Sequence, residues 1–196
     1  AGGHGDIFVN DAVSWSGNTF TLNAERNIAI NAPLKGSGTG KLALKYGQGA
    51  VAAGNTANYR INAPVDLAAG NNFSTMLGND GTVVQYRVIT SLGVAGSISG
   101  TDLQGINGHL VGNYVLGANI DASATVAWND NGDGTYAGFA PIGPDATLFF
   151  AGILDGLGHT INGVFINRPS TSGVGPFGYI GNTAEIRNIG LTSVNL

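Results

Sequence analysis

The chain of 196 residues has no cysteine, few charged residues and no long apolar run. Without cysteine it has neither disulfides nor thiolate metal sites, which fits a secreted bacterial protein as well as a cytosolic one. No apolar stretch approaches the roughly 20 residues that cross a bilayer, so we expect no membrane span. The opening residues, AGGHGDIFVN, lack the basic and apolar parts of a signal peptide, so a secreted protein would carry its signal upstream.

Cationic residues are also scarce. There are 8 Lys and Arg against 12 Asp and Glu, which gives a net charge of −4, and the cations are spread singly. Proteins that bind phosphate backbones cluster their cations, so we expect no nucleic acid partner. Glu occurs only at Glu25 and Glu185, whereas surface helices draw heavily on Glu, Lys and Arg. From these absences we expect neither a helical fold, nor a nucleic acid partner, nor a membrane span.

Glycine, asparagine and short alternating apolar sets dominate what is present. Gly accounts for 33 residues, and 43% of the chain is hydrophobic, enough for one domain with a continuous core. Alternating apolar positions bounded by Gly, Asn or Pro predict strands. These segments span 6–10, 18–24, 27–34, 41–47, 59–67, 82–89, 109–116, 159–166 and 184–196. The predicted fold class is all-β.

An internal repeat favours one all-β architecture over another. INAPLKGSG at 30–38 recurs as INAPVDLAAG at 61–70. A recurring turn signature with variable spacing indicates a β-solenoid, in which stacked turns let Asn bond its own backbone or the next coil. A β-sandwich would explain the strands but not the Asn residues at their ends. In KLALKYG (41–47), Leu42, Leu44 and Tyr46 should face inward and the lysines outward.

The order of several motifs resembles a known family. Residues 5–47, with VSWS, NIAINAPLKGSG and LALKYG in that order, are similar to the repeats of filamentous-haemagglutinin-like exoproteins. LDGLGHTINGVFINRP (154–169) resembles the GLUG motif of the same adhesins. Related pieces lie at 110–123, 138–143, 175–181 and 184–196.

The resemblance implies a right-handed parallel β-helix, here a fragment of a longer shaft. It also implies a passenger of two-partner secretion, secreted or displayed on the cell surface of a Gram-negative bacterium. We interpret residues 1–196 as one β-helix segment, with haemagglutinin-type repeats in 1–68 and GLUG-like coils in 109–196. Residues 69–108 match the repeat least, and 81–91 could pair as a hairpin strand outside the shaft.

One polar loop and three histidines are candidates for metal chemistry. WNDNGDGTY (128–136) resembles a calcium loop through Asn129, Asn131 and Asp133, but Ala140 stands where the closing acid belongs. A cation loop and an Asn/Asp/Gly-rich turn both remain open. The histidines, His4, His109 and His159, are too widely spaced to indicate a metal cluster, so we expect no metal and no cofactor.

Exposed aromatic side chains on a β-helix can stack on sugars. The aromatic candidates are Trp15, Tyr46, Tyr59, Trp128 and Tyr136. Trp15 lies within a strand, where a core position is at least as plausible. Trp128 and Tyr136 flank the longest loop and are the preferred contact residues.

Asp155 and His159 are spaced as an acid and a base would be on a helix. Glycines at 152, 156, 158 and 163 make a helix costly, at about 1 kcal/mol for each interior glycine. We therefore interpret Asp155, Gly156 and Gly158 as a turn, in which Asp155 accepts backbone N–H bonds and the glycines take positive φ. His159 would then begin the following strand.

These features predict a structural and binding segment of a surface adhesin rather than an enzyme. The expected partners are an outer-membrane two-partner-secretion transporter, a receptor or glycan on host cells, matrix or other bacteria, and further copies of the chain. The alternatives are a β-helical polysaccharide lyase or hydrolase, and the stalk of a contact-dependent toxin or cytolysin. The carboxylates lie mostly in apparent turns and form no cluster, which disfavours the enzyme.

Overall fold

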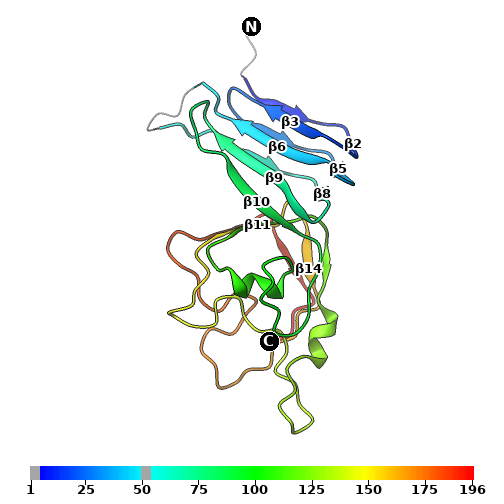
Figure 1. Cartoon of the computed structure of the whole chain (residues 1–196), viewed down its shortest axis with the longest axis vertical. Helices are drawn as coiled ribbons and strands as arrows, with labels where there is room; N and C mark the ends of the chain where they lie inside the picture. The colour runs from blue at the N-terminus through cyan, green and yellow to red at the C-terminus, as the bar shows by residue number, and fades with distance from the viewer. Residues whose placement is uncertain (1–4, 50–53) are drawn as a thin grey trace. The chain divides into compact units, whose positions relative to one another are not determined.

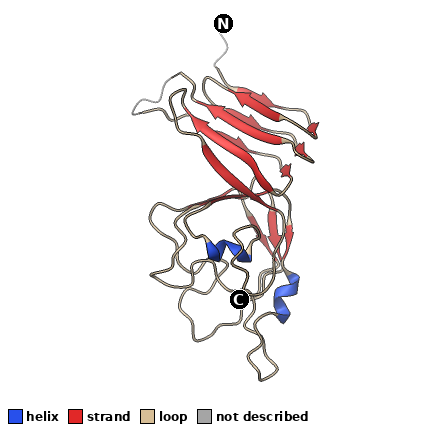
Figure 2. Ribbon diagram, in the orientation of Figure 1, coloured by secondary structure: helices blue, strands red, loops and turns tan. Residues whose placement is uncertain are grey.

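The computed structural model describes residues 5–49 and 54–196 as strands, turns and two short 3-10 helices. The all-β prediction is confirmed, and nearly all of the strand pairs are parallel (Figures 1 and 2). Contacts divide the chain into two compact units, Ala1–Val88 and Ile89–Leu196. Each unit is described by itself below. Among the described residues, no helix is long and apolar enough to cross a membrane.

The first unit is built from three stacks of parallel strands. The stacks run in the orders β1-β4-β7, β2-β5-β8 and β3-β6-β9. The chain visits each stack in turn before it returns to the first. The strands are β1 (Ile7–Val9), β2 (Val13–Trp15), β3 (Thr19–Asn23), β4 (Ile28–Ile30), β5 (Leu34–Gly36), β6 (Lys41–Tyr46), β7 (Tyr59–Ile61), β8 (Val65–Leu67), β9 (Gly70–Leu77) and β10 (Val84–Ile89).

Register in these stacks follows the sequence repeat. Ile30 pairs with Ile61, and Leu34 pairs with Val65, so the two INAP sequences lie directly one above the other. The preceding level is made by a shorter length of chain, because Val9 already pairs with Ile30. The connections between strands differ in length from one level to the next, whereas the short strands pair in the same way at each level.

Alternation explains which side of each strand is buried. In β6, Leu42 and Leu44 are buried whereas Lys41 is exposed, which confirms the predicted faces; Tyr46 is half-buried. Ile28 and Ile30 of β4 are likewise fully buried on either side of Ala29. Burying one such aliphatic side chain stabilises the fold by about 1.5–3 kcal/mol. Strands of only three residues are therefore stabilised by the burial of their inward side chains between stacked levels.

Asparagine ladders lock the first stack at both ends. At one end, Asn62 Nδ2 donates to Asn31 Oδ1 (2.7 Å), and Asn31 Nδ2 donates to Asn10 Oδ1 (2.8 Å). At the other end, Asn27 Nδ2 donates to Asp6 Oδ1, and Asn27 Oδ1 accepts the Asn58 backbone N–H. We call Asn10, Asn31 and Asn62 the asparagine ladder. The predicted bond from an Asn side chain to the backbone of the next level is confirmed for Asn27, whereas the asparagine ladder bonds side chain to side chain.

The irregular segment after residue 69 contains a hairpin. Strands β9 and β10 pair antiparallel, with Ser74 opposite Gln85 and a bulge between Tyr86 and Val88. The hairpin is not an excursion from the sheet, because β9 also pairs in parallel with β6. The prediction that 81–91 contributes a hairpin strand is met by β10, whereas its partner β9 belongs to the third stack.

The second unit repeats the parallel stacking with longer connections. One stack runs β11-β13-β15 and the other β12-β14-β16. Asn113 pairs with Ile153, and Ile153 pairs with Glu185, so the first of these levels takes up more chain than the second. The elements are η1 (Gln104–Gly108), β11 (Asn113–Leu116), β12 (Ile120–Asp121), η2 (Ser123–Ala127), β13 (Ile153–Asp155), β14 (Thr160–Asn162), β15 (Glu185–Arg187) and β16 (Gly190–Thr192).

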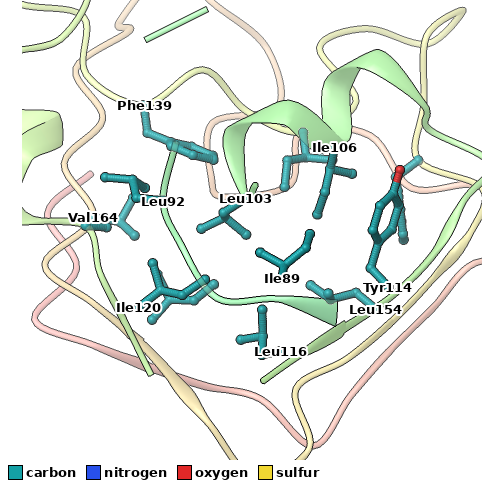
Figure 3. Packing of buried hydrophobic residues seen from close by; sticks show 14 of the residues in the cluster. Ile89, Leu92, Leu103, Ile106, Tyr114, Leu116, Ile120, Phe139, Leu154 and Val164 are labelled. Carbon is teal, nitrogen blue, oxygen red and sulfur yellow. The ribbon is translucent and has the colours of Figure 1, made fainter. Parts of the chain in front are cut away.

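The core of the second unit is filled partly from loops and from η1. Ile106 of η1 and Phe139 of a loop lie in one buried cluster with Leu116 and Leu154 of the strands (Figure 3). Gln104 of η1 also binds the backbone of a loop. Its side-chain amide donates to the Ala140 carbonyl (2.9 Å) and accepts the Ala140 N–H (3.0 Å). This pair of bonds ties the long connection to η1, between the isolated backbone bridges Gly138–Ile166 and Ile142–Phe177.

Candidate functional site

The suspected acid–base pair lies at a corner between two strands. Asp155 ends β13, and β14 begins at Thr160, so no helix places Asp155 and His159 on one face. Gly158 takes the predicted positive φ (84°), but the prediction is wrong for Gly156, because the other positive φ of the turn is at Leu157 (48°). Gly156 instead leaves room for Asn188, whose carbonyl oxygen would lie 2.5 Å from a Cβ at this position. Gly156 N–H donates to the Arg187 carbonyl (2.9 Å), which fixes the corner against the next level of the stack.

Asp155 is a buried structural carboxylate. It has 0% exposure and accepts the Leu157 N–H (2.9 Å), the role that the sequence assigns to it. Arg187 Nε donates to Asp155 Oδ2 at 2.8 Å, and Asn188 Nδ2 donates to Asp155 Oδ1 at 3.0 Å. Arg187 also contacts Glu185 through Nη1. These bonds join one level of the stack to the next, because Arg187 ends β15 directly beside Asp155.

His159 is likewise held by the stack rather than presented to solvent. It is 3% exposed, and its Nδ1 lies 3.3 Å from Asn119 Oδ1. The same Asn119 oxygen accepts the Thr160 N–H, and the His159 carbonyl accepts the Gly190 N–H. These contacts of His159 all serve the stacking of the strands. His109 is exposed, and His4 lies outside the described residues.

The long loop after η2 presents the two preferred aromatic residues differently. Trp128 is half-buried and stacks on Phe139, with ring centroids 6.4 Å apart and an interplanar angle of 21°. Because Phe139 is buried in the core cluster, Trp128 serves packing with at least one face of its ring. Tyr136 is 36% exposed and pairs through its backbone with Asp130 across the loop. Tyr136 is therefore the more available of the two for a ligand.

The polar side chains of the candidate cation loop form hydrogen bonds within the loop. Asn129 Nδ2 donates to the Gly138 carbonyl (2.6 Å), and Asn131 Nδ2 donates to Thr135 Oγ1 (2.9 Å). Asp133 Oδ1 accepts both the hydroxyl and the N–H of Thr135, and these bonds hold the pKa of Asp133 below its ordinary value. Among the residues that the structure describes, no three His, Asp or Glu side chains gather as a metal site would require.

The remaining aromatic candidates lie in the first unit. Trp15 packs on Phe20 at 5.1 Å, and its Nε1 donates to the Lys41 carbonyl. A Cβ on Gly36 would lie 2.8 Å from the Trp15 ring, so glycine makes room for it. Tyr59 is buried, and half-buried Tyr46 meets it edge-on at 5.4 Å. These rings fill space between strands.

One surface feature of the first stack gives only a partial signal in the sequence. On the outward side of this stack, Phe8, Ala29 and Arg60 lie in register on successive strands. Phe8 is 62% exposed. The small side chain of Ala29 leaves a hollow of about 160 Å³ between Phe8 and Arg60. Asp6 and Asn27 also line the hollow. The repeat of INAP would align Ala29 with Arg60, but no repeated motif aligns Phe8 with Ala29.

Comparison with known proteins gives two partial relatives. The chain is 35% identical over 131 residues to halomucin of Haloquadratum walsbyi, covering 62% of this chain and 1% of halomucin. It is 44% identical over 55 residues to a protein of Evansella cellulosilytica named as a Gly-rich membrane protein, covering 28% of this chain and 6% of that one. No protein-family model matches the chain, and no solved structure matches it significantly. The chain thus spans a small fraction of both relatives.

Proposed function

We propose that the chain is a right-handed parallel β-helix segment of a large secreted adhesin. It forms part of a stiff shaft that presents surface to host cells, matrix or neighbouring bacteria. The proposal includes export by a two-partner-secretion transporter and display at the surface of a Gram-negative bacterium, in the manner of filamentous-haemagglutinin-like exoproteins with a GLUG segment. It assigns no catalytic step to the chain.

The observation that carries the proposal is the stacking of the first unit. Three parallel stacks, each visited once per level, are compatible with a β-helix and support this proposal. Side chains repeat the stacking outside the sheets, as the bonds from Asn62 to Asn31 and from Asn31 to Asn10 illustrate. Stacked levels resist bending because bending would strain the backbone pairs and the side-chain hydrogen bonds between neighbouring levels. A rigid spacer is the function that such construction supports best.

Two exposed features supply candidate contacts on the shaft. Tyr136 lies on the loop of the second unit, and Phe8 lies beside the hollow in the first. Aromatic rings of this kind stack on sugar faces and apolar protein patches. The receptor or glycan partner, and association with further copies, belong to the proposal at these positions.

Adhesion of beads coated with the purified chain tests the proposal. Coated beads should attach to cultured epithelial cells or to bacteria more than beads coated with Ile30→Asp, which places a charge in the fully buried core and unfolds the stack. Phe8→Ala and Tyr136→Ala keep the fold and should reduce attachment if their rings make the contact. Equal attachment by folded chain and Ile30→Asp would show nonspecific adsorption and would overturn the adhesive function.

A shaft also makes a prediction independent of any receptor. Levels about 4.8 Å apart should give a strong reflection at that spacing from oriented fibres of the chain, perpendicular to the direction of the strands. A β-sandwich of the same composition would not give an axial repeat in the same orientation. Turnover of an acidic polysaccharide by the purified chain would contradict the structural function and favour the enzymatic alternative.

A further inference from the structure

The outward face of the third stack and its hairpin concentrates positive charge in an acidic protein. We call the outward side of β3, β6, β9 and β10 the cationic face. It carries Lys41 and Lys45 on β6 and Arg87 on β10, three of the eight Lys and Arg residues of the chain. The other outward residues on these strands are Thr19, Thr21, Asn23, Ala43, Asn72, Ser74, Met76 and Gln85. None of them is acidic.

Alternation fixes the side chains of this face outward. Leu42 and Leu44 are buried between Lys41, Ala43 and Lys45, and Tyr86 and Val88 are buried on either side of Arg87. The four strands lie side by side in the order β3-β6-β9-β10 (Figure 1).

The three cations are available to a ligand. Within residues 5–49 and 54–196, Lys41, Lys45 and Arg87 form no ion pair and no side-chain hydrogen bond. By contrast, Arg187 of the second unit is bound to Asp155 and Glu185. A cation without a carboxylate partner retains its full attraction for an external anion.

Small polar side chains form the floor between the cations. Ala43 pairs with Ser74, and Ser74 pairs with Gln85, so a row of short or amide side chains crosses the face between the charges. Lys41 and Lys45 lie roughly 13 Å apart along the strand, and Arg87 lies two strands away, roughly 10 Å across. The face is therefore a shallow surface with separated charges and hydroxyl or amide groups between them.

We infer that the cationic face binds an acidic polysaccharide. Separated cations match anionic groups that recur along a chain of sugars, and the hydroxyl and amide groups between them can bond sugar hydroxyls. Arg87 can hold a carboxylate or sulfate through two parallel N–H bonds, whereas each lysine contributes a point charge. The inference rests on the proposed adhesive function and names the chemical class of its ligand.

Nucleic acid and membrane fit this face less well. None of its outward residues is aromatic, so bases would find no ring to stack on, and the chain as a whole is acidic. A membrane-surface site needs apolar side chains that enter the lipid, and Met76 is the only large apolar outward residue on the four strands. Charge without aromatic or apolar contacts favours a hydrated polyanion.

Binding of defined polymers to the whole chain tests the inference. Polygalacturonate and dextran sulfate supply carboxylate and sulfate, and uncharged dextran supplies the sugar without charge. Both acidic polymers, or one of them, should bind at about 10 mM salt and be released at about 1 M, where the screening length falls from roughly 30 Å to 3 Å. Binding of dextran as strong as that of the acidic polymers would overturn the inference.

A matched pair of variants locates the site. Lys41→Gln should weaken binding about twofold to fivefold, whereas Lys35→Gln, another exposed strand lysine of the same unit, should leave it unchanged. Lys41→Gln combined with Lys45→Gln and Arg87→Gln should weaken it at least about tenfold. Equal losses for Lys35→Gln and Lys41→Gln would show a general charge effect and overturn the site.

Competing polyanions and adhesion complete the test. Tighter binding of duplex DNA, or of vesicles containing phosphatidylserine, than of either acidic polysaccharide would overturn the ligand class. If coated beads attach to cells but no acidic polysaccharide binds, this inference fails while the adhesive function stands. If the polysaccharide binds through Lys41 but the beads do not attach, the adhesive function fails and the site remains.

Discussion

The two units build parallel stacks from the same kinds of strand but secure them differently. The first unit uses a neutral ladder of identical side chains, Asn10, Asn31 and Asn62, at one end of its first stack. The second uses unlike groups drawn from distant connections, such as Asp155 with Arg187 and Gln104 with the Ala140 backbone. The comparison shows that asparagines at the same place in successive levels permit repeated side-chain bonds, whereas long connections require individual ones.

Charge divides along the same boundary. The first unit contains six Lys and Arg against five Asp and Glu, and the second contains two against seven. In the acidic second unit one of the two cations neutralises buried Asp155, whereas three in the first unit remain on one open face. The negative net charge of the whole chain therefore comes from the second unit, whereas the first is nearly neutral.

Breaking the Asp155 corner should have the largest effect. Asp155→Ala removes the acceptor of Leu157, Arg187 and Asn188 in a fully buried position, so we expect the free energy of unfolding to fall by about 3–5 kcal/mol. Urea denaturation of the second unit measures this loss. Asp145→Ala, whose carboxylate caps an exposed turn, is the control and should cost far less. Similar losses of free energy of unfolding from the two changes would contradict the structural role of the buried Asp155 carboxylate.

The Trp128 ring should come next in effect. Trp128→Ala removes a half-buried ring stacked on Phe139, and we expect a loss of roughly 2 kcal/mol, less than for a fully buried aromatic residue. Tyr136→Ala should change stability by less than about 0.5 kcal/mol, because its side chain is more exposed. Thermal melting separates the two residues. A large loss for Tyr136→Ala would contradict its assignment as a contact residue.

The asparagine ladder should show a smaller, graded effect. Asn31→Ala removes two ladder bonds and Asn10→Ala removes one, so we expect losses of about 1–2 and 0.5–1 kcal/mol. The middle position should therefore cost about twice as much as the end position in chemical denaturation. Equal losses would show that the bonds form independently of the stack, and the contrast between the units would weaken.

The smallest effect concerns pH. Hydrogen bonds from Thr147 and Leu148 hold the pKa of Asp145 below its ordinary value of 3.8. Because the folded pKa is the lower one, the stabilisation is present above the ordinary value and is lost as pH falls through the folded value. Asp145→Asn should therefore flatten the acid limb of the stability curve slightly, with no change near neutral pH. A change near neutral pH instead would contradict the assigned cause.

The strands and their faces could be predicted because their signal is local. Alternation in KLALKYG and the recurrence of INAP report burial and stacking within a short window, and DGLG indicates a turn by itself. The partner of Asp155 could not be predicted in this way. Arg187 lies a full level further along the chain, and connections of unequal length hide which positions come into register.

Packing from loops was also beyond the sequence patterns. The sequence favours Trp128 as a surface residue because it borders a long polar loop, but the loop returns to place Phe139 against its ring. Gln104 gives no periodic signal, although its amide makes two bonds to the Ala140 backbone. The cationic face gives only a partial signal, because alternation in β6 predicts outward Lys41 and Lys45 but Arg87 joins them only when β6 and β10 lie in one sheet.

The asparagine ladder would allow one level of the first unit to be removed by a single deletion in the gene. Asn31 and Asn62 occupy equivalent places, each followed by Ala-Pro, so removing residues 31–61 would join Ile30 to Asn62 and set Asn62 upon Asn10. Recombination between the two INAP sequences would make the same deletion in one step. We expect the shortened chain to fold, with cooperative melting as the check. Loss of all folded structure would show that the levels are not interchangeable.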